Sequence, residues 1–156
     1  MDQIVQLDAA ISTLMRVLTI DERRLSSNLG AAPFNPIDLE TLSFLHRHPG
    51  SLAKDAADYL GVRSTTMQSV VDRLHKRGLL QRDNTALKGR AVALSLSGKG
   101  MKLRQELHTQ NLKNCEQMLA SLPAHDQTDF IRNMATIART VSLNMAHNPA
   151  KIWAGP

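Results

Sequence analysis

The first thirty residues carry apolar side chains at alternating steps of three and four positions. This spacing places them on one face of a helix, in the pattern with which helices pack along a seam. Two and a half heptads are too few for a free coiled coil, so the seam predicts packing within a domain or across a dimer. Gly30 ends the segment. The apolar positions are Ile4, Leu7, Ile11, Leu14 and Leu18.

Three shorter helices are predicted in the middle of the chain. The first begins at Asn35-Pro36, a cap residue followed by proline at the first helical position, and ends at 48–50. The second covers Leu52 to Leu60 and is closed by Gly61. The third runs from Ser64 to Arg77. A helix, a short glycine turn and a second helix form the helix-turn-helix pattern. The side chains expected to face inward are Leu52, Ala56, Tyr59 and Leu60 on the second helix, and Met67, Val70, Val71 and Leu74 on the third.

After Gly78 the apolar spacing changes from the helical period to strict alternation. Leu79 to Arg82 is a short strand candidate, and residues 91–96 alternate as a half-buried strand does. The turn-rich residues 83–90 between them carry basic side chains at the tip. Two antiparallel strands joined by such a loop form a hairpin, which is the wing of a winged helix.

Two long helices are predicted to complete the fold. Ser97 opens one that runs to about Ser121, and Pro123 separates it from the last helix. Residues 148–156 are expected to form an irregular tail. The predicted fold class is therefore mainly α with a small β-hairpin wing, a winged helix-turn-helix core flanked by N- and C-terminal helices. The last helix carries its apolar side chains at Phe130, Met134, Ile137, Val141 and Met145.

Length and composition narrow the class of protein. The 156 residues correspond to about one domain. Aromatic residues make up only 3% of the chain, which argues against proteins that stack single-stranded bases on aromatic side chains. No apolar run approaches a membrane span, and the N-terminus has Asp2 and Asp8 where a signal peptide needs basic residues. We expect a soluble, cytoplasmic protein without a membrane partner.

The positive charge is concentrated in the middle third of the chain. The formal net charge is +5. Residues 50–102 contain ten basic and four acidic side chains, and the rest of the chain is close to neutral. Clustered positive charge attracts a polyphosphate through counterion release. A solvated basic face without a partner is the alternative explanation of the charge alone.

The outer face of the helix from Ser64 to Arg77 is rich in short hydroxyl and amide side chains. Such groups can bond base edges in a major groove, and Gln68 can bond an adenine edge with two hydrogen bonds. An ordinary polar surface is the alternative. Asp72 lies on this face and is expected to orient Arg73 or Lys76. The candidates for base contacts are Ser64, Thr65, Thr66, Gln68 and Ser69, those for phosphate contacts are Arg63, Arg73, Lys76 and Arg82, and those for the wing are Lys88 and Arg90.

Three segments of this pattern resemble the MarR family of bacterial winged helix-turn-helix repressors. They are residues 62–67, 71–82 and 90–100, and the order of predicted elements extends the resemblance over essentially the whole chain. The family typically has Asp-x-Arg at the wing. Here Lys88 stands at the Asp position and only Arg90 matches.

The resemblance implies an obligate homodimer that binds a pseudo-palindromic duplex site. It implies dimerisation through segments 1–30 and 97–147, and DNA binding through segment 36–96. Many members of the family also bind a small aromatic or phenolic ligand between the dimerisation helices and the winged helix, and a shift of the two recognition helices then releases the DNA. The apolar stripes suit the dimer independently, and the interface residues expected from them are Ile4, Leu7, Ile11, Phe130, Ile137 and Val141.

Other chemistry is weakly represented in the sequence. Cys115 falls at an apolar position of a long helix, which favours a buried, inert thiol. His46 and His48 are two residues apart on a helix and so point to different sides. There is no glycine-rich phosphate loop, nucleophile motif or pair of acids at catalytic spacing, so we expect neither an enzyme nor a cofactor or metal.

The sequence therefore predicts a sequence-specific, duplex-DNA-binding transcriptional regulator, acting as a repressor. The alternative is a winged-helix protein-interaction module that uses the same hairpin against an acidic partner. That module would need an apolar patch on the outer face of residues 64–77, where this sequence has Thr, Gln, Ser and Lys.

Overall fold

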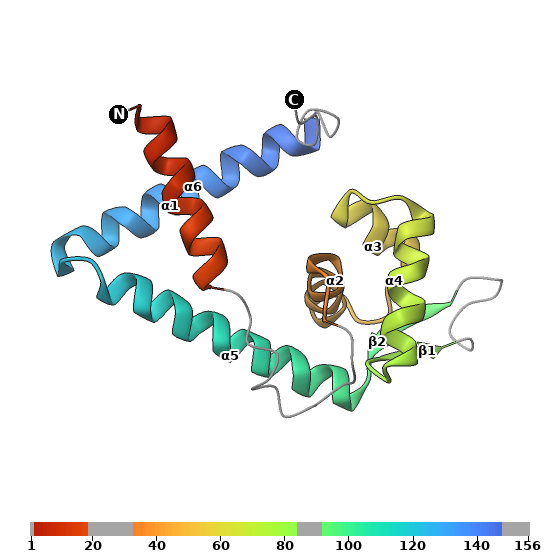
Figure 1. Ribbon diagram of the computed structural model, residues 1–156. Helices are drawn as coiled ribbons and strands as arrows, with labels where there is room; N and C mark the ends of the chain where they lie inside the picture. Colours follow the sequence, from red (N-terminus) through yellow and green to blue (C-terminus); the bar gives the residue numbers. More distant parts are fainter. Residues whose placement is uncertain (1, 19–32, 84–91, 148–156) are drawn as a thin grey trace.

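The computed structural model describes residues 2–18, 33–83 and 92–147, with the backbone alone for 144–147. These ranges contain six helices and one antiparallel hairpin (Figure 1). The mainly α fold with a β-hairpin wing is confirmed. The elements are α1 (Gln3–Val17), α2 (Pro36–Arg47), α3 (Ala53–Leu60), α4 (Ser64–Lys76), β1 (Leu80–Asp83), β2 (Ala93–Leu96), α5 (Gly98–Ala120) and α6 (Ala124–His147).

A single apolar core joins α2, α3, α4, the hairpin and the first half of α5. The apolar stripe predicted for α4 is buried along its whole length. It packs against Leu42 and Leu45 of α2, and Leu103 and Leu107 of α5 belong to the same core. Burial of one large apolar side chain stabilises a fold by about 1.5–3 kcal/mol, so this stripe fixes α4 firmly in the winged helix.

The hairpin pairs Leu80 with Leu96 and Asp83 with Ala93. The first strand begins one residue later than predicted, because Leu79 closes the end of α4 by donating its N–H to the carbonyl of Leu74 at 3.0 Å. A further bridge joins Leu94 to Ser51, whose carbonyl accepts the Leu94 N–H at 2.8 Å. The start of α3 is thereby attached to the hairpin.

Two local expectations for α3 are corrected by the structure. The helix begins at Ala53, and Asp55 caps it by accepting the N–H of Leu52 at 2.8 Å. Tyr59 does not face the core. Its ring packs against Phe44 with centroids 5.0 Å apart, and its hydroxyl accepts a hydrogen bond from Arg47 at 3.2 Å, so the tyrosine stays about half exposed. Ala57 is buried in its place.

The long helices extend away from this core. In Figure 1, α5 runs away from the hairpin and α6 turns back above it, while α1 lies in the same part of the view, away from α3 and α4. No residue of α1 is buried, and Ile4 is 74% exposed. The division of the chain into a DNA-binding region and dimerisation segments stays a prediction, and the tail lies outside the described residues. Along the part of the chain that the structure describes, no helix is long and apolar enough to cross a membrane.

The corner between α4 and β1 is attached to the start of α5 by Ser97. Its hydroxyl donates to the carbonyl of Gly78 at 2.6 Å and accepts the N–H of Gly100 at 3.0 Å. Its own N–H donates to the carbonyl of Leu79 at 2.9 Å. Ser97 is therefore both the N-cap of α5 and a connection from α5 to the end of α4.

Gly100 allows this close approach because it has no side chain. A Cβ at this position would lie 2.2 Å from the carbonyl oxygen of Leu79, closer than any real contact. We expect Gly100→Ala to destabilise the protein by about 1–3 kcal/mol, since the first turn of α5 must move away from the α4–β1 corner. The measurement is urea unfolding at fixed protein concentration.

Gly98→Ala is the matched control, because it lies in the same helical turn and its added Cβ meets nothing within 4 Å. It is expected to leave the free energy of unfolding unchanged or to increase it slightly. Equal effects of the two substitutions would show that the close contact with Leu79 is not what requires glycine.

Candidate nucleic-acid interface

One face of α4 is polar and open to solvent, as the sequence predicted. Its turn from α3 passes through Gly61, whose φ of 65° is the left-handed conformation that favours glycine. Arg63 is the N-cap, so α4 begins at Ser64. The exposed side chains of the helix and its cap are Arg63, Ser64, Thr65, Thr66, Gln68, Ser69, Asp72, His75 and Lys76.

Arg73 is held by a buried carboxylate on another helix. Asp38, in the first turn of α2, is completely buried and accepts hydrogen bonds from two guanidinium nitrogens of Arg73, with Nε 3.2 Å from Oδ2. The hydrogen bond to Asp38 raises the pKa of Arg73 above its usual value. The same Oδ2 accepts the N–H of Asn35 at 3.0 Å. Arg73 thus connects α4 to the start of α2, and its contact with phosphate stays a prediction.

Asp72 pairs with Arg82 rather than with the two cations expected from the sequence. Asp72 Oδ1 accepts hydrogen bonds from a terminal guanidinium nitrogen of Arg82 on β1 and from Nε2 of Gln68 at 3.0 Å. The hydrogen bond from Arg82 lowers the pKa of Asp72 below its usual value, so the carboxylate is ionised at neutral pH. The expectation that Asp72 orients Arg73 or Lys76 is wrong. It connects α4 to β1.

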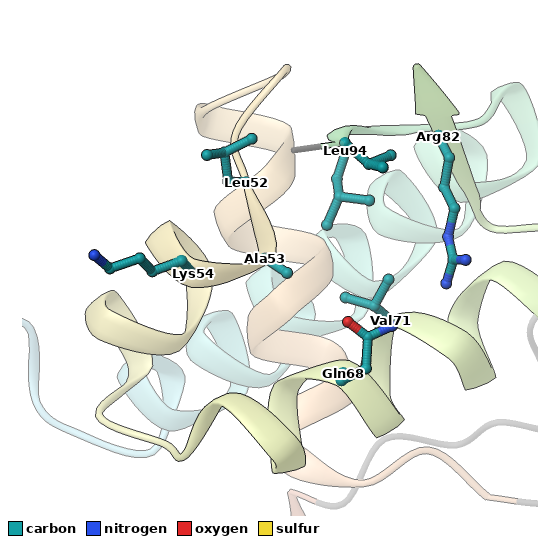
Figure 2. A pocket seen from close by; sticks show the side chains of 8 residues that line it. Leu52, Ala53, Lys54, Gln68, Val71, Arg82 and Leu94 are labelled. Carbon is teal, nitrogen blue, oxygen red and sulfur yellow. The ribbon is translucent and has the colours of Figure 1, made fainter. Parts of the chain in front are cut away.

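A cavity of about 420 Å³ opens between α3, α4 and the hairpin (Figure 2). Its apolar lining includes Leu52, Val71 and Leu94, and its polar lining consists of Lys54, Gln68 and Arg82. The structure therefore brings together Gln68 and Arg82, two candidates from different elements. Lys54 was not among the predicted site residues. Its signal in the sequence is a cation in the first turn of the first helix of the helix-turn-helix.

The remaining candidates fall in two groups. Lys88 and Arg90 lie outside the described residues. The proposed dimer positions Ile4, Leu7, Ile11, Ile137 and Val141 are all exposed, and Phe130 is half-buried.

Cys115 is exposed in this chain, which contradicts the expectation of a buried thiol. The reason is that the second half of α5 extends beyond the core. Among the described residues, no cluster of His, Cys, Asp and Glu could hold a metal ion.

Comparison with known proteins identifies this winged helix. The sequence model of the MarR family matches residues 33–91, the segment that runs from the start of α2 through the wing. This is a family of transcriptional regulators, so the expectation of a protein that is not an enzyme agrees with the match. Among curated proteins, sequence comparison finds no relative.

Solved structures of transcriptional regulators have the same fold. The PcaV transcriptional regulator from Streptomyces coelicolor is 21% identical, covers 90% of this chain and 98% of its own, and superposes with a TM-score of 0.65. PcaV in complex with its natural ligand is 22% identical, with 88% and 90% covered and a TM-score of 0.58. FabT from Streptococcus pneumoniae, in complex with DNA, is 16% identical, with 90% and 98% covered and a TM-score of 0.74. At these identities the likeness concerns the fold.

The ion pair between Asp38 and Arg73 yields a stability prediction. Arg73→Ala leaves a completely buried carboxylate without its cation, and we expect a loss of about 3 kcal/mol in the free energy of unfolding. Arg73→Lys should lose less, because a lysine keeps the charge but not the paired geometry of a guanidinium. Lys76→Ala, an exposed cation on the same helix, is the control. Urea unfolding that gives the alanine variants equal stability would contradict a structural role for the pair.

Proposed function

We propose that this chain, whose residues 33–91 match the MarR family, is a transcriptional repressor that binds a pseudo-palindromic duplex site as a homodimer. The observation that carries the proposal is the exposed face of α4. It presents hydroxyl and amide groups between cations, and such groups bond base edges and phosphates in a major groove.

The arrangement of charge supports a duplex partner. Arg63 stands at the N-terminal end of α4, Lys76 lies in its last turn, and Lys54 and Arg82 line the same cavity as Gln68. The cations thus surround the short polar side chains that would enter the groove. Phosphate contacts hold a protein in register while base contacts specify the sequence, and this face offers both.

The exposed face of α4 disfavours a protein-docking role for the winged helix. Within the described part of the chain, the large apolar side chains left exposed lie on α1, α3, α5 and α6, and none is on α4. A winged helix that docks on another protein needs an apolar patch where α4 has Thr65, Gln68 and Ser69. We therefore favour DNA over an acidic protein as the partner.

The long helices support a homodimer. The apolar side chains of α1 and α6 are exposed in the single chain, with Leu7 at 60% and Ile137 at 55%. Stripes of this kind on two helices are larger than the scattered apolar side chains of a monomer surface, and a second copy would cover them. A two-fold dimer presents two α4 helices and so reads a symmetric site.

A second cavity supports release by a small ligand. It has a volume of about 150 Å³ and lies between α2 and α5, with Leu39 and Leu107 as apolar lining. Its polar lining consists of Glu40, Ser43, Arg104, His108 and Asn111. Two proteins of the same fold have been solved with a partner, FabT in complex with DNA and PcaV in complex with its natural ligand. We propose that a small aromatic or phenolic molecule binds between these helices and shifts the winged helix relative to α5.

Selection of bound sequences from a random duplex pool tests the DNA-binding proposal. We expect a symmetric motif with half-sites about one helical turn apart. Binding should weaken several-fold or more between about 50 and 200 mM salt, since phosphate contacts release counterions. Arg63→Ala should weaken binding to all sequences and reduce the salt slope by about one. Arg139→Ala on α6 is the matched control. Recovery of no common sequence would contradict the proposal.

Titration of the bound duplex with phenol or benzoate tests the proposed release. Either molecule should increase the Kd for DNA, as measured by fluorescence anisotropy. Arg104→Ala should reduce the effect of benzoate on the Kd more than it reduces the effect of phenol. Only benzoate carries a carboxylate that can pair with the guanidinium. Lys102→Ala, an exposed cation on the same helix, is the control. An unchanged Kd with both molecules would contradict release through this class of ligand.

A further inference from the structure

A carboxylate stands in the middle of the surface assigned to DNA. Asp72 lies on the same exposed face of α4 as Gln68 and Lys76, and its side chain is 57% exposed. A negative charge near phosphates weakens binding to every DNA sequence by Coulomb repulsion. If α4 binds DNA, Asp72 must therefore contribute something to binding that outweighs its repulsion of the phosphates.

Asp72 uses a single oxygen to hold two side chains of that surface. Oδ1 accepts from Gln68 Nε2 at 3.0 Å, one helical turn earlier on α4, and from Arg82 on β1. An ionised carboxylate only accepts hydrogen bonds, and of the two ends of an amide only the nitrogen donates. The bond therefore fixes which end of the Gln68 amide faces Asp72.

We propose that Asp72 is a positioning residue for sequence recognition: it fixes the amide of Gln68 so that this side chain reads an A·T base pair, while keeping Arg82 beside it. The inference rests on the proposed binding of duplex DNA. It concerns base discrimination at one position of each half-site, whereas the proposed function concerns binding itself.

The geometry leaves Gln68 able to make the contact. The amide nitrogen has two hydrogens, so one remains after the bond to Asp72, and the oxygen keeps its full capacity to accept. In the view of Figure 2, the nitrogen of Gln68 is on the side of Arg82 and the oxygen on the opposite side. One donor and one acceptor in a fixed order match the N7 and N6 groups of adenine in the major groove.

Removal of the carboxylate then has two effects of opposite sign. Binding to unrelated sequences becomes tighter, because a negative charge is lost and Arg82 is released toward phosphate. Discrimination at the position read by Gln68 becomes weaker, because the amide can turn over and lose its fixed order of donor and acceptor. A purely structural role for Asp72 would change binding to all sequences in the same direction.

The test measures the Kd of the full-length protein for duplexes that carry each of the four base pairs at one motif position. That position is found by comparing the motifs of the wild type and of Gln68→Ala: it is the one at which the wild type prefers a base pair and the variant does not. We expect the wild type to favour A·T there by about tenfold, the scale of a bidentate contact. Asp72→Asn, which keeps the shape but can donate as well as accept, should reduce that ratio at least about threefold and should bind a random duplex more tightly.

A double-mutant cycle and a charge control sharpen the result. In the Gln68→Ala background, Asp72→Asn should cause no further loss of discrimination, because the side chain that it positions is gone. Asp58→Asn removes an exposed carboxylate from α3 and should leave the base preference unchanged. Urea unfolding of each variant establishes that the fold is intact. Asparagine is used in place of Asp72 because it fills the same space as the aspartate.

Three results would overturn the inference while the proposed function stands. In the first, the wild type selects a motif but Asp72→Asn keeps the full discrimination. In the second, Asp72→Asn weakens binding to all sequences equally. In the third, Gln68→Ala removes no preference from the motif. A wild type that selects no sequence would overturn the proposed function and the inference together.

Discussion

The ion pair between the buried carboxylate of Asp38 and the partly exposed guanidinium of Arg73 is the constraint on which the placement of α4 depends. A completely buried carboxylate is tolerated only when a cation and hydrogen bonds compensate for its lost hydration. Asp38 obtains both, from the guanidinium of Arg73 and from the N–H of Asn35. Because the guanidinium fork must meet this carboxylate in one geometry, α4 can take only a narrow range of positions against the start of α2. Burial of the apolar stripe holds α4 against the core but does not fix its orientation, because the hydrophobic effect is not directional. The ion pair fixes that orientation.

The other end of α4 is constrained by the start of α5. Ser97 bonds the carbonyl of Gly78, and Gly100 lies against the carbonyl of Leu79. A displacement of α5 would thus move the α4–β1 corner, through the hydrogen bond of Ser97 and through the close packing of Gly100 against Leu79. In a dimer formed by the long helices, the separation of the two α4 helices would follow from the direction of α5. Through this connection, a ligand in the cavity between α2 and α5 would influence the proposed binding of DNA.

Much of the winged helix could be predicted because its signals are local. The apolar stripe of α4, the turn at Gly61 and the alternation after Gly78 each occupy a few consecutive residues. The partner of Arg73 could not be predicted in this way, since Asp38 is 35 positions earlier in the chain. Tyr59 was misplaced because its helical spacing resembles that of a core residue, whereas the polar hydroxyl is satisfied at the surface by Arg47. The attachment of Ser51 to the hairpin likewise depends on tertiary contacts, which periodicity does not contain.

The ion pairs also change how the charge of the middle third is interpreted. The excess of six positive charges over residues 50–102 counts Arg73 in full, but Asp38, outside that stretch, compensates for it. Arg82 is compensated by Asp72 within the stretch. Under the proposed function, the charge that α4 would offer to phosphate therefore comes chiefly from Arg63 and Lys76 at its two ends, with Lys54 of α3 as a further cation. Between those ends the surface is polar and nearly neutral. A surface of this kind relies on oriented hydrogen bonds more than on charge, and the orientation of Gln68 is accordingly the feature through which it would distinguish one sequence from another.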